Sequence, residues 1–322
     1  MIRRLEWEAT PWRSVNPPEP WTGPVPIWAM QALWVLAEYR YCNTPQLKQL
    51  AWPTIQERQG RNRLQKLWTA GWIQYTGVLS QALRGQGRYP RVWALTPAGD
   101  AQVRQWTRSW NSDHVWPDWE APWPLYAIPR FLHDLELVDL AIALSRTWHD
   151  VDADPWIVNP GILGTRRAWR RFPAAGGAVV LAPDLLVMDR TYARRPILVE
   201  YERFNDRDKY WGKLQRLAKV LANHTYQAHF ALPPLMLTVI WRDPGPTRPH
   251  GDRSRHGGLG LSALAQRSGI RPDHLAFLFA DELTTESPGT TRLLAADGTR
   301  SAQRLADLGL PVARAGLPQR PT

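Results

Sequence analysis

The sequence predicts a chain of mixed α and β structure, of the α+β or α/β class, with two domains. Its 322 residues are enough for two domains of ordinary size, and a hydrophobic content of 44% is typical of a globular protein. In the first part of the chain, capped helical patterns precede two short strand patterns. In the second part, strand patterns alternate with long amphipathic helices, which favours a central sheet.

Charge and cysteine content narrow the class of protein further. Forty Lys and Arg residues against 29 Asp and Glu give a formal charge of +11, which favours a polyanionic partner, nucleic acid first. Cys42 is the one cysteine, so an internal disulfide and a zinc site built on paired cysteines are excluded. No apolar run has the length of a membrane span, and the N-terminus lacks a signal-peptide core. We therefore expect a soluble, cytoplasmic protein with no membrane partner.

The first 110 residues follow the order of a winged helix-turn-helix. Residues 1–26 are rich in Pro and Trp and predict an irregular arm. A helix is expected at 28–41, a short one starts at Thr44-Pro45 as cap and first helical residue, and a third runs over 55–70 before Gly71. Strands at 72–78 and 89–95 and a helix from Pro97 to 110 complete the pattern. Residues 27–110 are therefore predicted to form a winged helix-turn-helix domain that binds double-stranded DNA.

Basic residues occupy the two parts of this domain that would face DNA phosphates. Between Ile55 and Arg91 there are seven Lys or Arg residues and one acid, Glu57. The alternative is a solvated basic helix in a winged fold that binds protein. DNA is favoured because both the third helix and the wing loop are basic. The predicted contacts are Arg58, Arg61, Asn62, Arg63 and Lys66 in the helix, and Arg84, Arg88 and Arg91 in or after the wing loop.

The second half of the chain predicts a sheet with helices. Residues 111–130 read as a Pro- and Trp-rich linker, 131–282 as a central-sheet domain, and 283–322 as a largely irregular tail with one short helix at 301–308. Within the domain, helices are expected at 131–148 and from Asn205 or Asp206 to 223, and strands at 156–158, 179–188, 197–203, 235–241 and 274–279. The basic segment GTRRAWRR carries Arg167 and Arg170, which we expect to meet DNA phosphates.

Acidic residues interrupt two of these apolar strands. Asp184 follows Pro183 at the first, and Glu200 and Glu202 lie in the second. Because strand side chains alternate between faces, both glutamates point to the same side. Two carboxylates on one face are costly to bury without partners. They either form a site or face solvent and pair with nearby arginines, for which Arg194, Arg195 and Arg203 are the candidates.

The order of Pro183-Asp184, a strand, Glu200-x-Glu202 and a helix resembles the core of the PD-(D/E)xK nucleases. The resemblance implies a restriction-endonuclease-like domain in which Asp184 and Glu200 hold Mg²⁺ or Mn²⁺. Magnesium prefers oxygen ligands, and such a metal activates water and stabilises phosphoryl-transfer charge.

The sequence departs from the nuclease pattern at one position. Glu202 stands where the pattern has lysine. In some members of the superfamily the lysine comes from the following helix, where Lys209 and Lys213 lie one turn apart. Lys213 is favoured, because Leu214 beside it would hold the helix against the sheet. The expected catalytic set is therefore Asp184, Glu200, Glu202 and Lys213.

The chain as a whole resembles the replication-relaxation family of plasmid and mobile-element proteins. The resemblance covers roughly residues 27–280. It rests on LTPAG at 95–99, FLHDLELVDL at 131–140, Pro183-Asp184, VEYER at 199–203 and KYWGKLQRLAKVL at 209–221. It implies DNA binding linked to plasmid replication, relaxation or transfer, with other mobile-element proteins as partners.

Three functions remain open on the sequence alone. The first is a DNA-binding accessory protein whose nuclease-like domain adds a second DNA surface. The second is an active metal-dependent endonuclease or nickase. The third is a transcription regulator without catalysis, whose second domain forms a homodimer or binds a partner protein.

Overall fold

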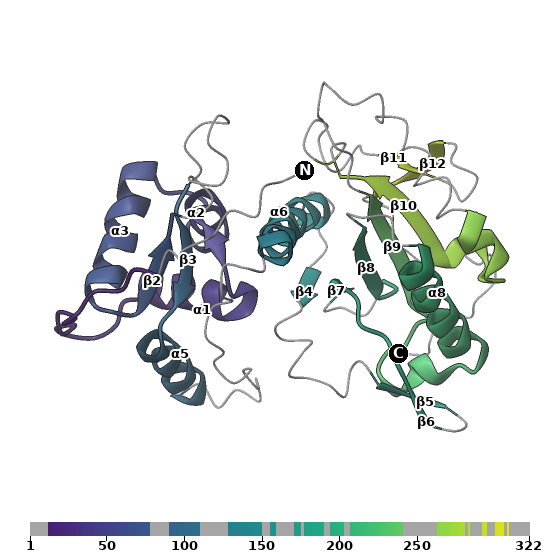
Figure 1. The fold of residues 1–322 in the computed structure, drawn as a ribbon, viewed down its shortest axis with the longest axis horizontal. Coiled ribbons are helices and arrows are strands. Elements are labelled where there is room, and N and C mark those ends of the chain that lie inside the picture. The colour runs from purple at the N-terminus through teal and green to yellow at the C-terminus, as the bar shows by residue number, and fades with distance from the viewer. Residues whose placement is uncertain are drawn as a thin grey trace, which may run out of the picture. The chain divides into compact units, whose positions relative to one another are not determined.

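The computed structural model describes a chain of mixed α and β structure in two compact units, so the predicted α+β class is confirmed (Figure 1). Unit 1 is Met1–Ile142 and unit 2 is Ala143–Thr322. The division lies inside the helix Ile128–His149. The described residues are 12–77, 90–109, 128–149, 155–158, 171–174, 177–189, 194–202, 207–240, 263–280, 283, 292–294, 300–305 and 308.

Helices and a small sheet build unit 1. The helices are α1 (Ile27–Tyr39), α2 (Thr44–Ala51), α3 (Glu57–Thr69), α5 (Pro97–Ser109) and the first part of α6 (Ile128–His149). The strands β1 (Cys42–Asn43), β2 (Ile73–Thr76) and β3 (Val92–Leu95) form an antiparallel sheet in the order β1-β3-β2. The helix and strand order agrees with the prediction, except that the two-residue strand β1 was not expected.

Helix α2 begins one residue away from the predicted cap. Asn43, and not Thr44, is the N-cap: its side chain accepts a hydrogen bond from the backbone N–H of Gln46, and the Gln46 side chain accepts one from the Asn43 N–H, both at 2.9 Å. This reciprocal pair satisfies two backbone donors that the first turn of a helix leaves open. Pro45 remains in the first turn, where its missing N–H has no cost.

Tryptophans tie the N-terminal arm and the turns of unit 1 to its core. Trp21 stacks on Trp72, with ring centroids 4.8 Å apart, and lies 5.9 Å from Trp28. The indole N–H of Trp52 donates to the carbonyl of Trp28 at 2.8 Å. The arm also forms a bridge between Arg13 and strand β2. The described part of the arm, residues 12–26, is therefore anchored although it contains no helix.

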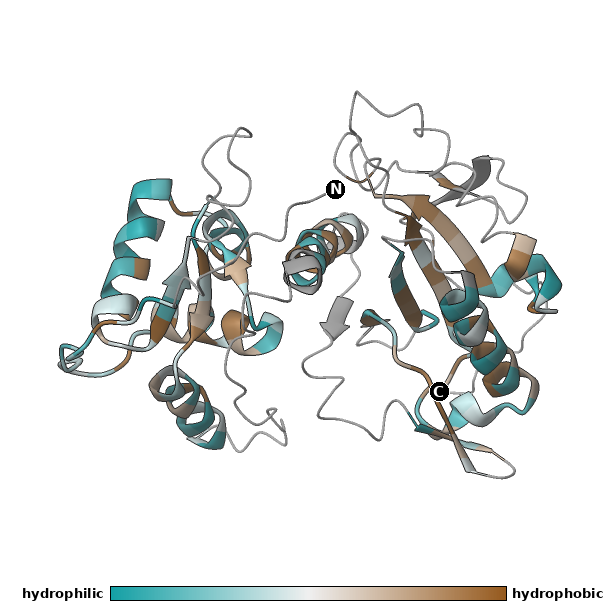
Figure 2. Cartoon of the chain, in the orientation of Figure 1, coloured by the Kyte–Doolittle hydropathy of each residue, from teal (hydrophilic) through white to brown (hydrophobic). Residues whose placement is uncertain are grey.

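A seven-stranded sheet is the centre of unit 2. Its order is β12-β11-β10-β9-β8-β7-β4, with β8, β9 and β10 parallel to one another. The strands are β4 (Pro155–Val158), β7 (Leu185–Asp189), β8 (Ile197–Glu202), β9 (Leu235–Ile240), β10 (Leu275–Phe279), β11 (Arg292–Leu294) and β12 (Arg300–Arg304). Helix α8 (Arg207–Ala222) connects β8 to β9 and packs on one face of the sheet. Figure 2 shows mostly apolar residues in β9 and β10 and both polar and apolar residues along α8.

Two predictions for unit 2 were wrong. The strand expected over 179–188 is two strands: β6 (Gly177–Val180) pairs with β5 (Arg171–Ala174) in a separate two-stranded sheet, and β7 joins the large sheet. Pro183 lies between β6 and β7 and has no N–H for a sheet hydrogen bond. The segment after 283 was expected to be irregular with a helix at 301–308, yet β11 and β12 extend the sheet there. Strand β11 has only three residues, RLL, and β12 has the polar sequence RSAQR, so neither carries an apolar alternation.

Candidate functional site

The acidic strand β8 is buried along its whole length. All six of its residues are buried, including Glu200 and Glu202. Leu198 packs in one apolar cluster with Leu214 and Leu217 of α8. Because Leu198, Glu200 and Glu202 alternate with the other three residues, the two glutamates share the face that α8 covers. The alternative in which these carboxylates face solvent is therefore wrong.

Lys213 of α8 brings its ammonium group to both glutamates. Its Nζ forms a very short ion pair with Oε2 of Glu200 and lies 3.4 Å from Oε1 of Glu202. The side chains of Glu200, Glu202 and Lys213 are only 3%, 7% and 11% exposed. The structure thus places the lysine predicted from the following helix against the carboxylates predicted from the strand. Lys209, the other candidate one turn earlier, is exposed.

Asp184 joins this group from the turn before β7. Its Oδ2 accepts a hydrogen bond from the backbone N–H of Tyr201 at 2.8 Å, and its own N–H donates to the carbonyl of Val199 at 2.9 Å. Its negative charge raises the pKa of both Glu200 and Lys213. All four residues predicted for the catalytic set are therefore neighbours, and we call Asp184, Glu200, Glu202 and Lys213 the acid–lysine cluster.

Two polar residues of this region were missed from the sequence. The hydroxyl groups of Tyr210 and Thr238 are 2.8 Å apart and buried. Thr238 lies directly across from Glu200 in the parallel pair of β8 and β9. Tyr210 precedes Lys213 by one helical turn, so a helical projection could have found it. Nothing in the sequence fixes the register of β9, so Thr238 could not have been found.

Burial governs the titration of the acid–lysine cluster. Burial raises the pKa of Glu200 well above its ordinary value, the negative charge of Asp184 raises it further, and Lys213 opposes both. Burial alone would lower the pKa of Lys213, but the carboxylates of Glu200, Asp184 and Glu202 together raise it. The ammonium group of Lys213 is therefore the charge on which ionisation of Glu200 depends.

The donor chemistry of the cluster suits a hard divalent cation, but its arrangement does not. Carboxylate oxygens are the ligands that Mg²⁺ and Mn²⁺ prefer. Within the described residues, however, no group of three or more His, Cys, Asp or Glu is placed to hold a metal ion. The Lys213 ammonium lies against both glutamates, at the oxygens that a metal would need. The residues therefore do not form a metal site in this arrangement.

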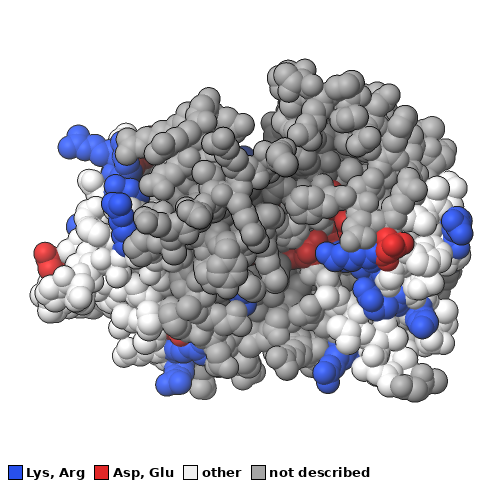
Figure 3. Space-filling model, viewed as in Figure 1, with Lys and Arg blue, Asp and Glu red and all other residues white. Residues whose placement is uncertain are grey.

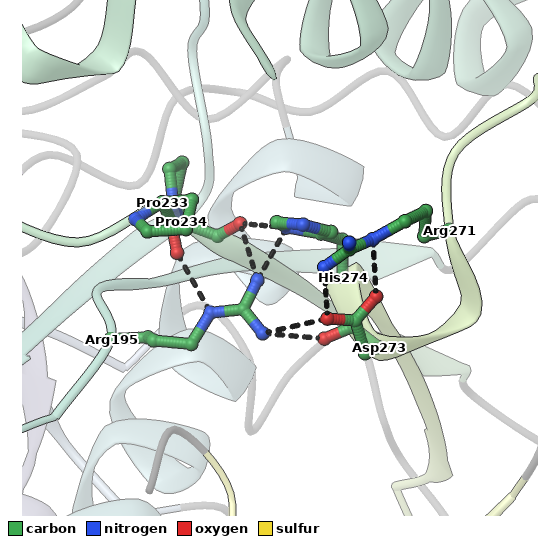
Figure 4. Close-up of polar contacts among 6 residues, drawn as sticks. All are labelled: Arg195, Pro233, Pro234, Arg271, Asp273 and His274. Carbon is green, nitrogen blue, oxygen red and sulfur yellow. Dashed lines mark hydrogen bonds and ion pairs between the residues drawn. The ribbon is translucent and has the colours of Figure 1, made fainter. Parts of the chain in front are cut away.

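Arg195, a predicted solvent partner of the glutamates, lies at the other end of β8 (Figure 4). Its guanidinium donates to the backbone carbonyls of Pro233 and Asp273, both at 2.8 Å, and of Pro234 at 3.4 Å. The Nδ1 of His274 lies 2.9 Å from the Pro234 carbonyl. These contacts join the segments that lead into β8, β9 and β10. Arg195 therefore fixes the start of three parallel strands and does not neutralise the acid–lysine cluster.

The predicted DNA contacts of α3 divide into two groups. Arg58, Arg61, Asn62 and Lys66 are exposed. Figure 3 shows blue side chains gathered over this helix. The ion pair between Arg61 and Glu57 is 3.9 Å long and mostly exposed, so it contributes little. The exposed group is available to a ligand.

Arg63 differs from its neighbours in α3. Its guanidinium carbon lies 5.3 Å from the ring centroids of both Trp28 and Trp52. Cation–π contact of this kind holds the side chain against the protein. Arg63 therefore fastens α3 to the segments that carry the two tryptophans, and its contact with DNA stays a prediction.

Of the five remaining predicted DNA contacts, only Arg91 lies within the described residues. Arg91 is exposed and its guanidinium lies 4.3 Å above the ring of Tyr75. Arg84 and Arg88 of the expected wing loop, and Arg167 and Arg170 of the basic segment, lie outside the described residues.

Comparison with known proteins gives no relative for this chain. It matches no protein-family model, no curated protein and no solved structure. Among the helices that the structure describes, none combines the length and apolar character needed to cross a membrane.

Proposed function

We propose that the protein is a DNA-binding accessory protein of a plasmid or mobile element that acts in replication, relaxation or transfer. In this proposal unit 1 is a winged helix-turn-helix, and α3 enters the major groove of double-stranded DNA. The observation that carries this proposal is the separation of buried apolar residues from exposed basic residues around α3. Leu64 and Leu67 are buried in the core of unit 1, whereas Arg58, Arg61 and Lys66 are exposed on the other side.

The strand arrangement supports the same proposal. Helices α2 and α3 precede an antiparallel pair, β2 and β3, as in a winged helix-turn-helix. Arg91 lies next to the start of β3, where a wing would rejoin the sheet. A ligand that met α3 and the connection between β2 and β3 together would meet positive charge at both places. Phosphate contacts of this kind position a protein on DNA.

Loss of two exposed arginines of α3 should weaken DNA binding in a salt-dependent way. For Arg58→Ala plus Arg61→Ala, we expect weaker binding to duplex DNA and a salt dependence whose slope falls by about 1.8, because each lost phosphate contact removes about 0.9. Fluorescence anisotropy between about 50 and 200 mM salt measures both.

The matched control removes two exposed arginines elsewhere, with Arg108→Ala in α5 plus Arg267→Ala in unit 2. It has the same net charge as the α3 variant and should keep the slope of the wild type. Equal slopes for all three proteins would remove α3 from the DNA interface.

A second candidate function is a metal-dependent endodeoxyribonuclease. The observation that favours it is the convergence of Asp184, Glu200 and Glu202 with Lys213, which matches the residue types of a PD-(D/E)xK site. Binding of Mg²⁺ or Mn²⁺ would require the Lys213 ammonium to leave Glu200.

Cleavage of supercoiled plasmid with either metal tests this candidate. Nicking by the wild type and not by Asp184→Ala would support a catalytic site. If the protein binds the plasmid but leaves it intact with both metals, unit 2 would be a nuclease-like scaffold without catalysis.

A further inference from the structure

Helix α8 uses one side for the fold and presents a basic side to solvent. Tyr210, Leu214 and Leu217 are fully buried, and Lys213 belongs to the acid–lysine cluster. Among the other cations of α8 whose side chains the structure describes, Lys209, Arg216 and Lys219 are exposed. Figure 3 shows blue side chains gathered along this helix. The exposed cations therefore lie on the part of α8 that its packing leaves uncovered.

The spacing of these cations puts them on one side of the helix. Lys209 and Arg216 are seven residues apart, close to two full turns, and Lys219 follows three residues later. From Lys209 to Lys219 the helix rises about 15 Å. Asp208, the one acidic residue of α8, is exposed on the same side of the helix, so the three cations leave a net positive charge there. The result is a strip of positive charge, which we call the α8 basic face: Lys209, Gly212, Arg216 and Lys219.

Gly212 lies in the middle of this face, three residues after Lys209 and four before Arg216. A glycine inside a helix is less favourable than alanine. Packing does not require it here, because a Cβ at this position would meet one atom, Nη1 of Arg216, at an ordinary distance of 3.7 Å. The missing Cβ leaves the Arg216 guanidinium beside the helix backbone at Gly212. Because glycine has no side chain, it allows the backbone of a ligand to approach a helix closely.

We infer that the α8 basic face is a second nucleic-acid surface that binds the phosphate backbone of DNA. Duplex DNA carries one charge per 3.4 Å of each strand, so a strip about 15 Å long meets several phosphates. The side chains offer guanidinium and ammonium groups but no base-reading pattern, so binding is independent of sequence. This inference rests on the proposed function, in which unit 1 also binds DNA, and it assigns the second surface to a helix outside unit 1.

The test compares three pairs of substitutions in the full-length protein on a linear duplex of mixed sequence. For Arg216→Ala plus Lys219→Ala, we expect weaker binding and a salt slope reduced by about 1.8. The control pair Arg108→Ala plus Arg267→Ala should keep the wild-type slope, and Arg58→Ala plus Arg61→Ala reports on α3. A wild-type slope for the α8 pair, beside a reduced slope for the α3 pair, would overturn the inference and leave the proposed function intact. No binding of the duplex by the wild type would overturn both.

The variant Gly212→Ala distinguishes a loss of close contact with DNA from a loss of protein stability. For Gly212→Ala, we expect a melting temperature higher by roughly 2 to 4 °C, because alanine is the better helix former, together with weaker DNA binding. A more stable protein with weaker binding supports close contact at this face, since a variant that merely unfolds cannot give that combination. Unchanged or tighter binding would show that no phosphate backbone approaches Gly212.

Discussion

Replacement of Lys213 with alanine is expected to lower the free energy of unfolding of unit 2 by about 3 to 5 kcal/mol. The ammonium group lies against Glu200 and Glu202, and all three side chains are almost completely buried. Removal of one partner of a buried ion pair leaves charge without compensation in a region of low dielectric constant. Urea denaturation followed by circular dichroism measures the loss.

The pH dependence of this variant should be steeper than that of the wild type. Without Lys213, nothing opposes the burial and the Asp184 charge that raise the pKa of Glu200. The folded variant then binds a proton that the unfolded chain releases above the ordinary range of a glutamic acid. Stability must therefore fall as the pH rises from that range through the raised pKa.

Two control variants test whether the lost ion pair causes the instability of Lys213→Ala. Lys219→Ala removes an exposed lysine from the same helix and should change stability by less than about 0.5 kcal/mol. Addition of Glu200→Gln and Glu202→Gln to Lys213→Ala should recover much of the loss and abolish the steep pH dependence, because amides carry no charge to compensate. If Lys213→Ala were as stable as Lys219→Ala, the glutamates could not depend on Lys213 for their burial.

The acid–lysine cluster shows which parts of a site local sequence patterns can predict. Alternation in β8 places Glu200 and Glu202 on one face, and the 3.6-residue repeat of α8 turns Lys213 towards the apolar side. Both inferences need only a few neighbouring residues. The partner of Tyr210 depends instead on the register of β9, which begins 33 residues after Glu202, and local patterns do not fix that register.

Arg63 and strand β12 are two further features that local sequence patterns do not predict. In the sequence Arg63 is indistinguishable from Arg58 and Arg61, because the tryptophans that hold it come from two distant segments. Strand β12 has the sequence RSAQR, without apolar alternation, and it lies at the edge of the sheet. Edge strands are commonly short and polar, which protects the sheet from pairing with another chain. Pattern analysis therefore overlooks them.

Substitution of Gly99 by alanine is expected to destabilise unit 1 by about 3 kcal/mol or more. Gly99 lies in the first turn of α5, where its N–H donates to the Thr96 hydroxyl at 3.2 Å. A Cβ at this position would lie 2.0 Å from the backbone carbonyl oxygen of Trp72. That carbonyl accepts a hydrogen bond from the Thr96 N–H at 3.0 Å, so it cannot move without loosening the start of α5. The glycine of the LTPAG motif is therefore a close-packing requirement.

Gly60 provides the matched control, since it is also a buried helical glycine of unit 1. Its Cβ would meet side-chain atoms of Lys48 and Ile55 at 3.6 and 3.7 Å, which are ordinary contacts. Gly60→Ala should therefore be neutral, or stabilising by up to about 1 kcal/mol, through better helix propensity. A thermal denaturation series of the wild type and both variants makes the comparison. Equal melting temperatures for Gly99→Ala and Gly60→Ala would contradict the close approach of α5 to Trp72.

The variant Gly99→Ala also tests how the stability of unit 1 relates to its proposed DNA binding. Gly99 is in α5, and the exposed arginines Arg58 and Arg61 are in α3, so no phosphate contact is removed with it. DNA binding by Gly99→Ala should therefore decrease only as the folded fraction decreases, and the salt slope of the folded protein should remain that of the wild type. Arg58→Ala plus Arg61→Ala should show the reverse, with normal stability and a reduced slope. A reduced slope in fully folded Gly99→Ala protein would mean that α5 itself contacts DNA.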